Sequence, residues 1–73
     1  MTVDELKNWF TYHAPHGNQA QRYTDIREAA FVFAKTILDK TPSCADQTAA
    51  IRKVREAVMT ANAAIACEEN LSP

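Results

Sequence analysis

Apolar residues recur at helical spacing in two long stretches of this chain. In the first stretch, the positions three or four residues apart are Tyr23, Ile26, Ala30, Phe33 and Ile37. In the second, they are Ile51, Val54, Val58, Ala61 and Ile65. Such spacing places an apolar stripe along one side of a helix. The pattern therefore predicts an all-α chain with long helices over about 19–40 and 44–67.

A third, shorter helix is predicted at the start of the chain. Thr2 followed three residues later by Glu5 is the pattern of a capping box, in which Thr2 is the N-cap and Glu5 bonds back to it. This helix is expected over about 3–10. Pro15 then disfavours helix at the residue before it, and Gly17 and Asn18 are typical of a turn and an N-cap.

The two long helices are expected to form an antiparallel hairpin. Thr41 and Pro42 end the first of them, and Ser43 is predicted to cap the second, with Asp46 as its capping-box partner. So short a connection makes the two helices antiparallel neighbours. We expect a single helical-hairpin domain over residues 1–73, with a frayed tail from Glu68 to Pro73.

Each long helix also carries a second apolar stripe. One consists of Phe31, Ala34 and Leu38, and the other of Ala50, Ala57 and Ala64. A lone hairpin cannot bury both stripes of each helix, and a large exposed apolar surface is typical of an interaction site. A chain of 73 residues is also marginally stable alone. We therefore predict a compact homo-oligomer. Asn62, beside the seam, is expected to fix its register or oligomer state; the alternative is that it contacts a ligand at a subunit junction.

Net charge and hydropathy argue against two classes of partner, nucleic acids and membranes. The formal net charge is −1, so no general attraction to nucleic acid or membrane is expected. No apolar run approaches the ~20 residues of a membrane span.

Cys44 and Cys67, at the two ends of one predicted helix, would lie about 35 Å apart, which is too far for a disulfide. Both are expected to be reduced thiols of a cytosolic protein.

The segment before Pro15 holds the first candidate for ligand binding. Tyr12 and His13 precede this proline, which stiffens the backbone. Tyr12 offers a flat face on which a base can stack; alternatively, it packs on the hairpin and holds the N-terminal segment down. His13 is expected to hydrogen-bond backbone or ligand, because the spacing of His13 and His16 does not favour a metal site.

The start of the first long helix holds the second candidate. Tyr23 and Arg27 are four residues apart and share a helix face, with Arg22 nearby. Guanidinium groups match phosphate oxygens in a bidentate manner, so Arg27 with Arg22 is a candidate phosphate clamp. The alternative is that Arg27 pairs on the surface with Tyr23 or with a neighbouring carboxylate, Asp25 or Glu28.

Residues with catalytic chemistry follow no recognisable pattern. The two cysteines carry no nucleophile signature, and the paired carboxylates Glu68 and Glu69 lie in the predicted tail. A single glycine argues against a Gly-rich phosphate loop. The sequence therefore predicts a small oligomeric binding protein that has no cofactor and is not an enzyme.

Three motifs together resemble a known family. They are Phe10-Thr11-Tyr12-His13 with Pro15, the series Gln19, Arg22-Tyr23 and Ile26-Arg27, and the run Ala57-Val58-Met59 followed by Ala61-Asn62-Ala63-Ala64-Ile65-Ala66. Over about residues 6–68, the chain is similar to the phage anti-CBASS protein 2 family. The resemblance implies a small helical-hairpin protein that assembles into a compact homohexamer.

The same resemblance implies a function. Members of that family sequester the cyclic dinucleotides of bacterial immune synthases, such as cyclic GMP-AMP, without cleaving them, so that effector proteins are not activated. Some members also hold cyclic trinucleotides in a separate pocket on the hexamer axis. The implied partners are cyclic oligonucleotides and other copies of the chain, in the cytoplasm of the infected bacterium. No DNA or RNA polymer and no membrane is expected among the partners.

The resemblance also implies a site between subunits, formed by the N-terminal region of one and the long helix of another. The aromatic that stacks on the bases corresponds to Tyr12, and the basic residue that meets phosphate corresponds to Arg27. The side chains that would shape the pocket are His13, Pro15, Arg22 and Tyr23. Met59 and Asn62 are candidates for the wall that a second subunit contributes.

Two other functions are weighed against this one. The chain would be a structural or adaptor oligomer if its alanine-rich face docked another protein; Tyr12→Ala would then alter stability or assembly and no nucleotide affinity. A phosphodiesterase that cleaves the same signals is the third class. The sequence offers it neither metal ligands nor a catalytic base, and a linear nucleotide product would identify it.

Overall fold

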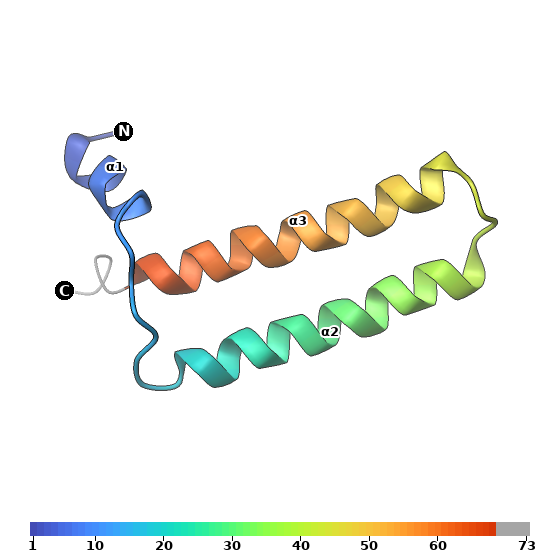
Figure 1. The fold of residues 1–73 in the computed structure, drawn as a ribbon, viewed down its shortest axis with the longest axis horizontal. Helices are drawn as coiled ribbons and strands as arrows, with labels where there is room; N and C mark the ends of the chain where they lie inside the picture. Colours follow the sequence, from blue (N-terminus) through green and yellow to red (C-terminus); the bar gives the residue numbers. More distant parts are fainter. Residues whose placement is uncertain (69–73) are drawn as a thin grey trace.

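The computed structural model describes residues 1–68, which form three helices and no strand. Helix α1 spans Val3–Trp9, α2 spans Gln19–Lys40 and α3 spans Ala45–Cys67. Figure 1 shows α2 and α3 side by side and antiparallel, with α1 near the C-terminal end of α3. The all-α fold with a short first helix and a long antiparallel hairpin is confirmed. The helix limits differ from the expected ones by one residue, at the end of α1 and at the start of α3.

Helix α1 begins at the predicted cap. The backbone N–H of Glu5 donates to Thr2 Oγ1 at 3.1 Å, which confirms Thr2 as the N-cap. Asp4 and Glu5 place negative charge in the first turn, where the helix dipole favours it. A helix of 7 residues is too short to be stable in isolation. Helix α1 therefore depends on its contacts with α3.

The cap of α3 differs from the prediction. The helix begins at Ala45, and its N-cap is Cys44, whose side chain makes no capping hydrogen bond. The predicted capping box of Ser43 with Asp46 is therefore wrong. Because the helix starts one residue later than the pattern indicated, Ser43 lies outside the cap position. Cys44 and Cys67 lie at opposite ends of α3, and both are free thiols.

A glutamine holds the turn between the two long helices. Gln47 Nε2 donates to the backbone oxygen of Leu38 at 3.2 Å and to that of Thr41 at 3.1 Å. Carbonyl groups in the last turn of a helix have no intrahelical donor. Gln47 therefore supplies a donor to the end of α2 from the first turns of α3, and the turn is closed by a side chain that is not part of a capping box.

A thin apolar seam joins α2 to α3. Ile65 is the only apolar side chain of the described residues that is buried, with 5% of its surface exposed. The other predicted seam positions of α3 are half-buried, namely Ile51, Val54, Val58 and Ala61. On α2 the pattern fails at Phe33, which is 59% exposed. Ala34 is half-buried in its place.

Helix geometry explains why the sequence did not separate Phe33 from Ala34. At about 100° per residue, the two positions lie roughly 50° on either side of the centre of the stripe. Either therefore continues the periodic pattern, and only the placement of the neighbouring helix decides between them. The packing turns the small residue Ala34 toward α3 and leaves the ring of Phe33 on the surface.

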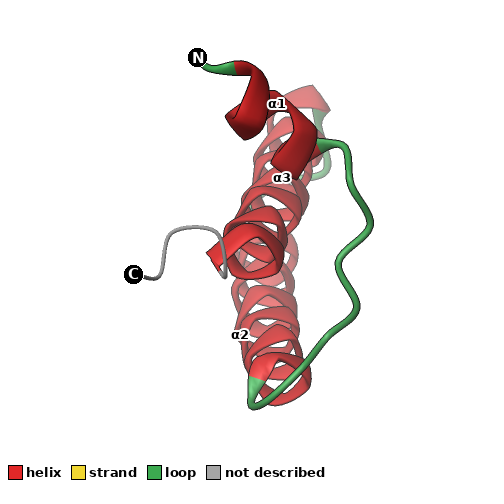
Figure 2. Cartoon of the chain, turned by 90° about the vertical axis from the view of Figure 1, so that its left-hand side faces the viewer, coloured by secondary structure: helices red, strands yellow, loops and turns green. Residues whose placement is uncertain are grey.

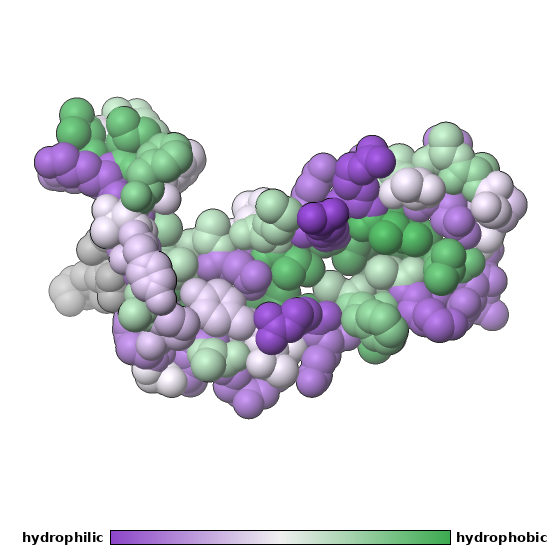
Figure 3. Space-filling model, viewed as in Figure 1, coloured by the Kyte–Doolittle hydropathy of each residue, from purple (hydrophilic) through white to green (hydrophobic). Residues whose placement is uncertain are grey.

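Much of the apolar surface of the chain remains exposed. Figure 3 shows apolar side chains on α1 and along the hairpin. The large hydrophobic residues that are more than 45% exposed are Met1, Val3, Leu6, Trp9, Phe10, Tyr12, Phe31, Val32, Phe33, Leu38 and Met59. Within residues 1–68, no helix is both long enough and apolar enough to cross a membrane.

Candidate ligand-binding site

The loop of residues 10–18 carries the first group of predicted site residues. Figure 2 shows it leaving α1 and running along one side of the hairpin to the start of α2. Near its start, Thr11 Oγ1 donates to the Lys7 carbonyl at 2.5 Å. Near its end, Gly17 has a φ of 57°, a left-handed conformation that glycine adopts without strain. The loop therefore turns sharply where it enters α2, as well as where it leaves α1.

His13 fastens the middle of this loop to α1. Its Nε2 lies 2.8 Å from the Asn8 backbone oxygen, and it is the donor because a carbonyl only accepts. This contact agrees with the prediction that His13 bonds to backbone or ligand. The same carbonyl accepts from Cys67 Sγ at 3.9 Å, while Asn8 Nδ2 donates to the Cys67 backbone oxygen at 3.4 Å. The end of α1 and the end of α3 are thus joined by reciprocal contacts.

Gln19 holds the end of the loop that leads into α2. It is the one buried polar side chain of the described residues, with 2% of its surface exposed. Its Nε2 donates to the Ile65 backbone oxygen at 3.0 Å and to Glu68 Oε1 at 3.1 Å, and its Oε1 accepts from the His16 backbone N–H at 3.1 Å. The first residue of α2 therefore contacts both the loop and the end of α3.

Arg22 takes part in the same network. Its NH1 lies 2.7 Å from Glu68 Oε1. The hydrogen bond from Arg22, followed by that from Gln19, lowers the pKa of Glu68 from its ordinary value, and the bond to Glu68 raises the pKa of Arg22. The prediction of a frayed tail is wrong for Glu68, because this residue is held by two side chains of α2; residues 69–73 lie outside the described part.

Tyr12 and Pro15 project from the loop into solvent. Tyr12 is 78% exposed, and its hydroxyl bonds to no described residue. It does not pack down on the hairpin, as one interpretation of the sequence suggested. Pro15 is exposed as well. The flat face of Tyr12 is therefore accessible to a ligand, on a loop that is anchored on both sides.

Arg27 is exposed on α2, and Tyr23 is half-buried one turn before it. Arg27 NH2 donates to Thr24 Oγ1 at 3.5 Å. Among the described residues it forms no ion pair with Asp25 or Glu28, and Asp25 accepts instead from Gln21 at 2.7 Å. Of the two candidate arginines, Arg22 is thus paired with Glu68, whereas Arg27 is exposed and has no carboxylate partner within residues 1–68.

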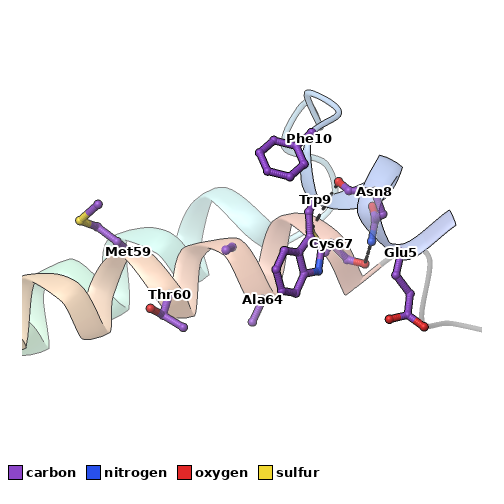
Figure 4. Close-up of a pocket in the computed structure, with 9 residues that line it drawn as sticks. Glu5, Asn8, Trp9, Phe10, Met59, Thr60, Ala64 and Cys67 are labelled. Atoms are coloured by element: carbon purple, nitrogen blue, oxygen red, sulfur yellow. Dashed lines mark hydrogen bonds between the residues drawn. The ribbon is translucent and has the colours of Figure 1, made fainter. Parts of the chain in front are cut away.

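A groove between α1 and α3 encloses about 940 Å³. Its lining residues are Glu5, Asn8, Trp9, Phe10, Met59, Thr60, Ala63, Ala64 and Cys67. Figure 4 shows the Trp9 ring beside α3, near Ala64, with the Phe10 ring above it and Met59 farther along α3. Alanines of α3 and the two aromatic residues make much of the groove wall apolar.

Met59 and Asn62, the residues assigned to the second subunit's wall, lie differently. Met59 is 60% exposed and lines the groove of its own chain. Asn62 is half-buried, and its Oδ1 is shielded from solvent without a hydrogen-bond partner among the described residues. A buried amide oxygen without a donor is costly. It is an acceptor that one chain alone leaves unsatisfied.

Sequence reasoning missed two parts of this site. Gln19 was part of a motif but had no assigned role, because its partners Ile65 and Glu68 are 46 and 49 residues away. Trp9 was not singled out, although a tryptophan at the end of an unstable short helix is a signal of an aromatic anchor. Within residues 1–68, no three His, Cys, Asp or Glu side chains gather in a group that can hold a metal ion.

Fold and site together define a class: a small all-α protein with an antiparallel hairpin, an anchored loop that displays an aromatic ring, and an exposed arginine on the helix that follows this loop. A family model described as "Acb2/Tad1, hairpin domain" matches residues 2–66. The chain therefore belongs to the Acb2/Tad1 hairpin-domain family, in agreement with the resemblance to anti-CBASS protein 2. Comparison with curated proteins and with solved structures gave no match.

Proposed function

We propose that this protein binds cyclic dinucleotide signals of bacterial anti-phage immunity, such as cyclic GMP-AMP, and sequesters them without cleaving them. Effector proteins then receive no signal. Membership of the Acb2/Tad1 hairpin-domain family supports this function. The structural observation that carries it is Tyr12, an aromatic ring that is 78% exposed on a loop fastened at both ends.

The chemistry of the ligand suits these residues. A cyclic dinucleotide presents two base faces and two negatively charged phosphates in one compact ring. Tyr12 stacks on a base, which contributes about 1–3 kcal/mol. Arg27 bonds to a phosphate, which contributes about 1.5–3 kcal/mol. His13, Pro15, Arg22 and Tyr23 shape the pocket around these two contacts.

The structure favours Arg27 over Arg22 as the phosphate ligand. Arg22 already has a carboxylate at 2.7 Å, and a phosphate would have to compete with it. Among the residues that the structure describes, Arg27 has only the Thr24 hydroxyl, at 3.5 Å. Arginine binding to phosphate is strongest when both of its parallel N–H groups are available, and this holds for Arg27. Arg22 then acts by supporting the loop and α3.

The complete site requires self-association. The described chain buries a single apolar side chain and exposes many large ones, so a monomer has little core. A homo-oligomer covers these surfaces, and a homohexamer is the assembly that the family resemblance implies. In it, Met59 and Asn62 of one subunit contribute to the wall of a neighbour's pocket. A second pocket on the oligomer axis would hold cyclic trinucleotides.

Calorimetric titration tests this proposal. The purified protein is titrated with cyclic GMP-AMP, cyclic di-GMP, cyclic di-AMP and one cyclic trinucleotide. We expect tight binding of at least one cyclic dinucleotide, because two stacks and two phosphate contacts together contribute about 5–12 kcal/mol before association costs. Failure of every ligand to bind at micromolar concentration would contradict the proposal.

The apolar groove favours a second candidate, an adaptor that docks a protein partner. Its aromatic residues and Met59 are of types enriched at protein interfaces. The two functions are separated by Tyr12→Ala, which removes a ring that makes no hydrogen bond within the described chain. A nucleotide-binding protein loses affinity and keeps its assembly, whereas an adaptor has no nucleotide affinity to lose.

A further inference from the structure

The C-terminal end of α3 carries carbonyl groups that helix geometry leaves without intrahelical donors. Two of them are bonded by side-chain amides from elsewhere in the chain. Gln19 Nε2 donates to the Ile65 oxygen at 3.0 Å, and Asn8 Nδ2 donates to the Cys67 oxygen at 3.4 Å. The Ile65 oxygen also accepts from the Glu68 backbone N–H, which a carbonyl with two lone pairs permits.

These two amide residues bracket the loop that carries Tyr12. Asn8 precedes residues 10–18, and Gln19 follows them directly. Each residue also bonds to the loop itself: the Asn8 carbonyl accepts from the His13 ring at 2.8 Å, and Gln19 Oε1 accepts from the His16 N–H at 3.1 Å. The loop is thus tied at two points to residues that are themselves tied to the end of α3.

The burial of the Gln19 side chain indicates that its hydrogen bonds have a structural role. A buried amide costs free energy unless its donors and acceptor are bonded, and an apolar residue of similar size would fill the space at lower cost. Gln19 is 2% exposed, with bonds to the loop, to α3 and to Glu68. The use of an amide here is explained if the position of the loop matters, because hydrogen bonds fix direction as apolar packing does not.

We propose that Gln19 and Asn8 are positioning residues that hold the Tyr12 loop in its ligand-binding conformation by anchoring both of its ends to the C-terminal carbonyls of α3. This inference rests on the proposed function. A loop ordered before binding does not lose its conformational freedom when the ligand arrives, and this raises affinity without any contact to the ligand. Neither amide contacts the nucleotide; both act through Tyr12.

The test compares Gln19→Met with Gln21→Met. Methionine keeps the length of the side chain and removes its hydrogen bonds. Gln21 is exposed on the same helix and bonds only to Asp25 among the described residues, so it is the matched control. Affinity for cyclic GMP-AMP, or for whichever cyclic dinucleotide the wild type binds most tightly, is measured by calorimetry at a temperature where circular dichroism shows each variant folded. Amide hydrogen exchange of residues 11–14 and of His16 is measured on the same unliganded samples.

We expect Gln19→Met to weaken binding by about tenfold and to accelerate exchange in the loop, including at the His16 N–H, while Gln21→Met matches the wild type in both. Wild-type affinity in folded Gln19→Met would overturn the inference and leave the proposed function intact. Absence of wild-type binding would overturn the proposed function itself. If Gln19→Met does not fold, Asn8→Ala is the second variant, with the same expected weakening and the same contradicting result.

Discussion

At the residue scale, the exposed ring of Tyr12 is central to the proposed site. Tyr12→Ala is expected to weaken the binding of a cyclic dinucleotide by about 5- to 150-fold, the equivalent of one base stack. Because Tyr12 is 78% exposed, the melting temperature and the assembly should not change. Calorimetry measures the affinity, and Tyr12→Phe, which keeps the ring, is the control. A loss of assembly with Tyr12→Ala would contradict a ligand role.

The two arginines of α2 should respond differently to substitution. Arg27→Ala is expected to weaken binding by about 10- to 150-fold through the loss of a phosphate contact and to make the affinity less dependent on salt. Arg22→Ala breaks the contact with Glu68 and should lower the melting temperature. Arg55→Ala, an exposed arginine on α3, is the control for net charge. An equal loss of affinity with Arg55→Ala would mean that Arg27→Ala acts through the net charge of the protein and not through a phosphate contact.

The free energy of unfolding is expected to depend on pH through the ionisation of Glu68. Its folded-state pKa is lowered, so the stabilisation is fully present above the ordinary value of 4.5 and is lost as the pH falls through the lower, folded-state value. Urea unfolding at fixed protein concentration should therefore show wild type more stable than Glu68→Gln above pH 4.5. This difference in the free energy of unfolding should disappear at lower pH. If it persists in acid, the ionised carboxylate of Glu68 is not its cause.

Residue type alone suggested base stacking for Tyr12 and phosphate binding for Arg27, because both depend on the side chain itself, and these roles stay predictions. The contacts that support the loop could not be found in the same way. The network of Gln19, Arg22 and Glu68 was not predicted, because it joins positions 46 or more residues apart. Glu68 was assigned to a frayed tail for the same reason: local pattern does not show which distant amide or guanidinium will meet a carboxylate.

At the scale of elements, periodicity and breakers placed all three helices to within one residue of their limits. Thr2 was a reliable cap because its partner Glu5 follows within one turn. Two local choices failed where tertiary packing decides. Ser43 was preferred over Cys44 as a cap on residue type, and Phe33 was preferred over Ala34 in the seam, although helix geometry allowed both.

The turn between α2 and α3 offers a direct test of the corrected cap. Gln47→Ala removes the two hydrogen bonds to the end of α2 and should destabilise the fold by about 1 kcal/mol. Ser43→Ala should have almost no effect, since Ser43 does not cap α3. Chemical unfolding of both variants at one protein concentration gives the comparison. If Ser43→Ala were less stable than Gln47→Ala, the original prediction of Ser43 as the N-cap of α3 would be supported.

At the scale of the whole molecule, the chain combines a well-formed hairpin with very little core. Ile65 alone among the described apolar side chains is buried, and aromatic residues of the N-terminal segment and of α2 remain exposed. If the chain associates as proposed, association contributes to its stability, and its apparent stability should rise with concentration. The same association would bring Met59 and Asn62 of one chain to the Tyr12 loop of another. Folding, assembly and ligand binding are thus linked in the proposed account.

Recovery of the ligand from its complex tests the central claim most directly. The protein is incubated with cyclic GMP-AMP, separated from free nucleotide by gel filtration and heated, and the released nucleotide is identified by chromatography. The account predicts that nucleotide elutes with an oligomer of the protein and is recovered intact and cyclic. Nucleotide that does not elute with the protein, or that is released as a linear product, would contradict sequestration without cleavage.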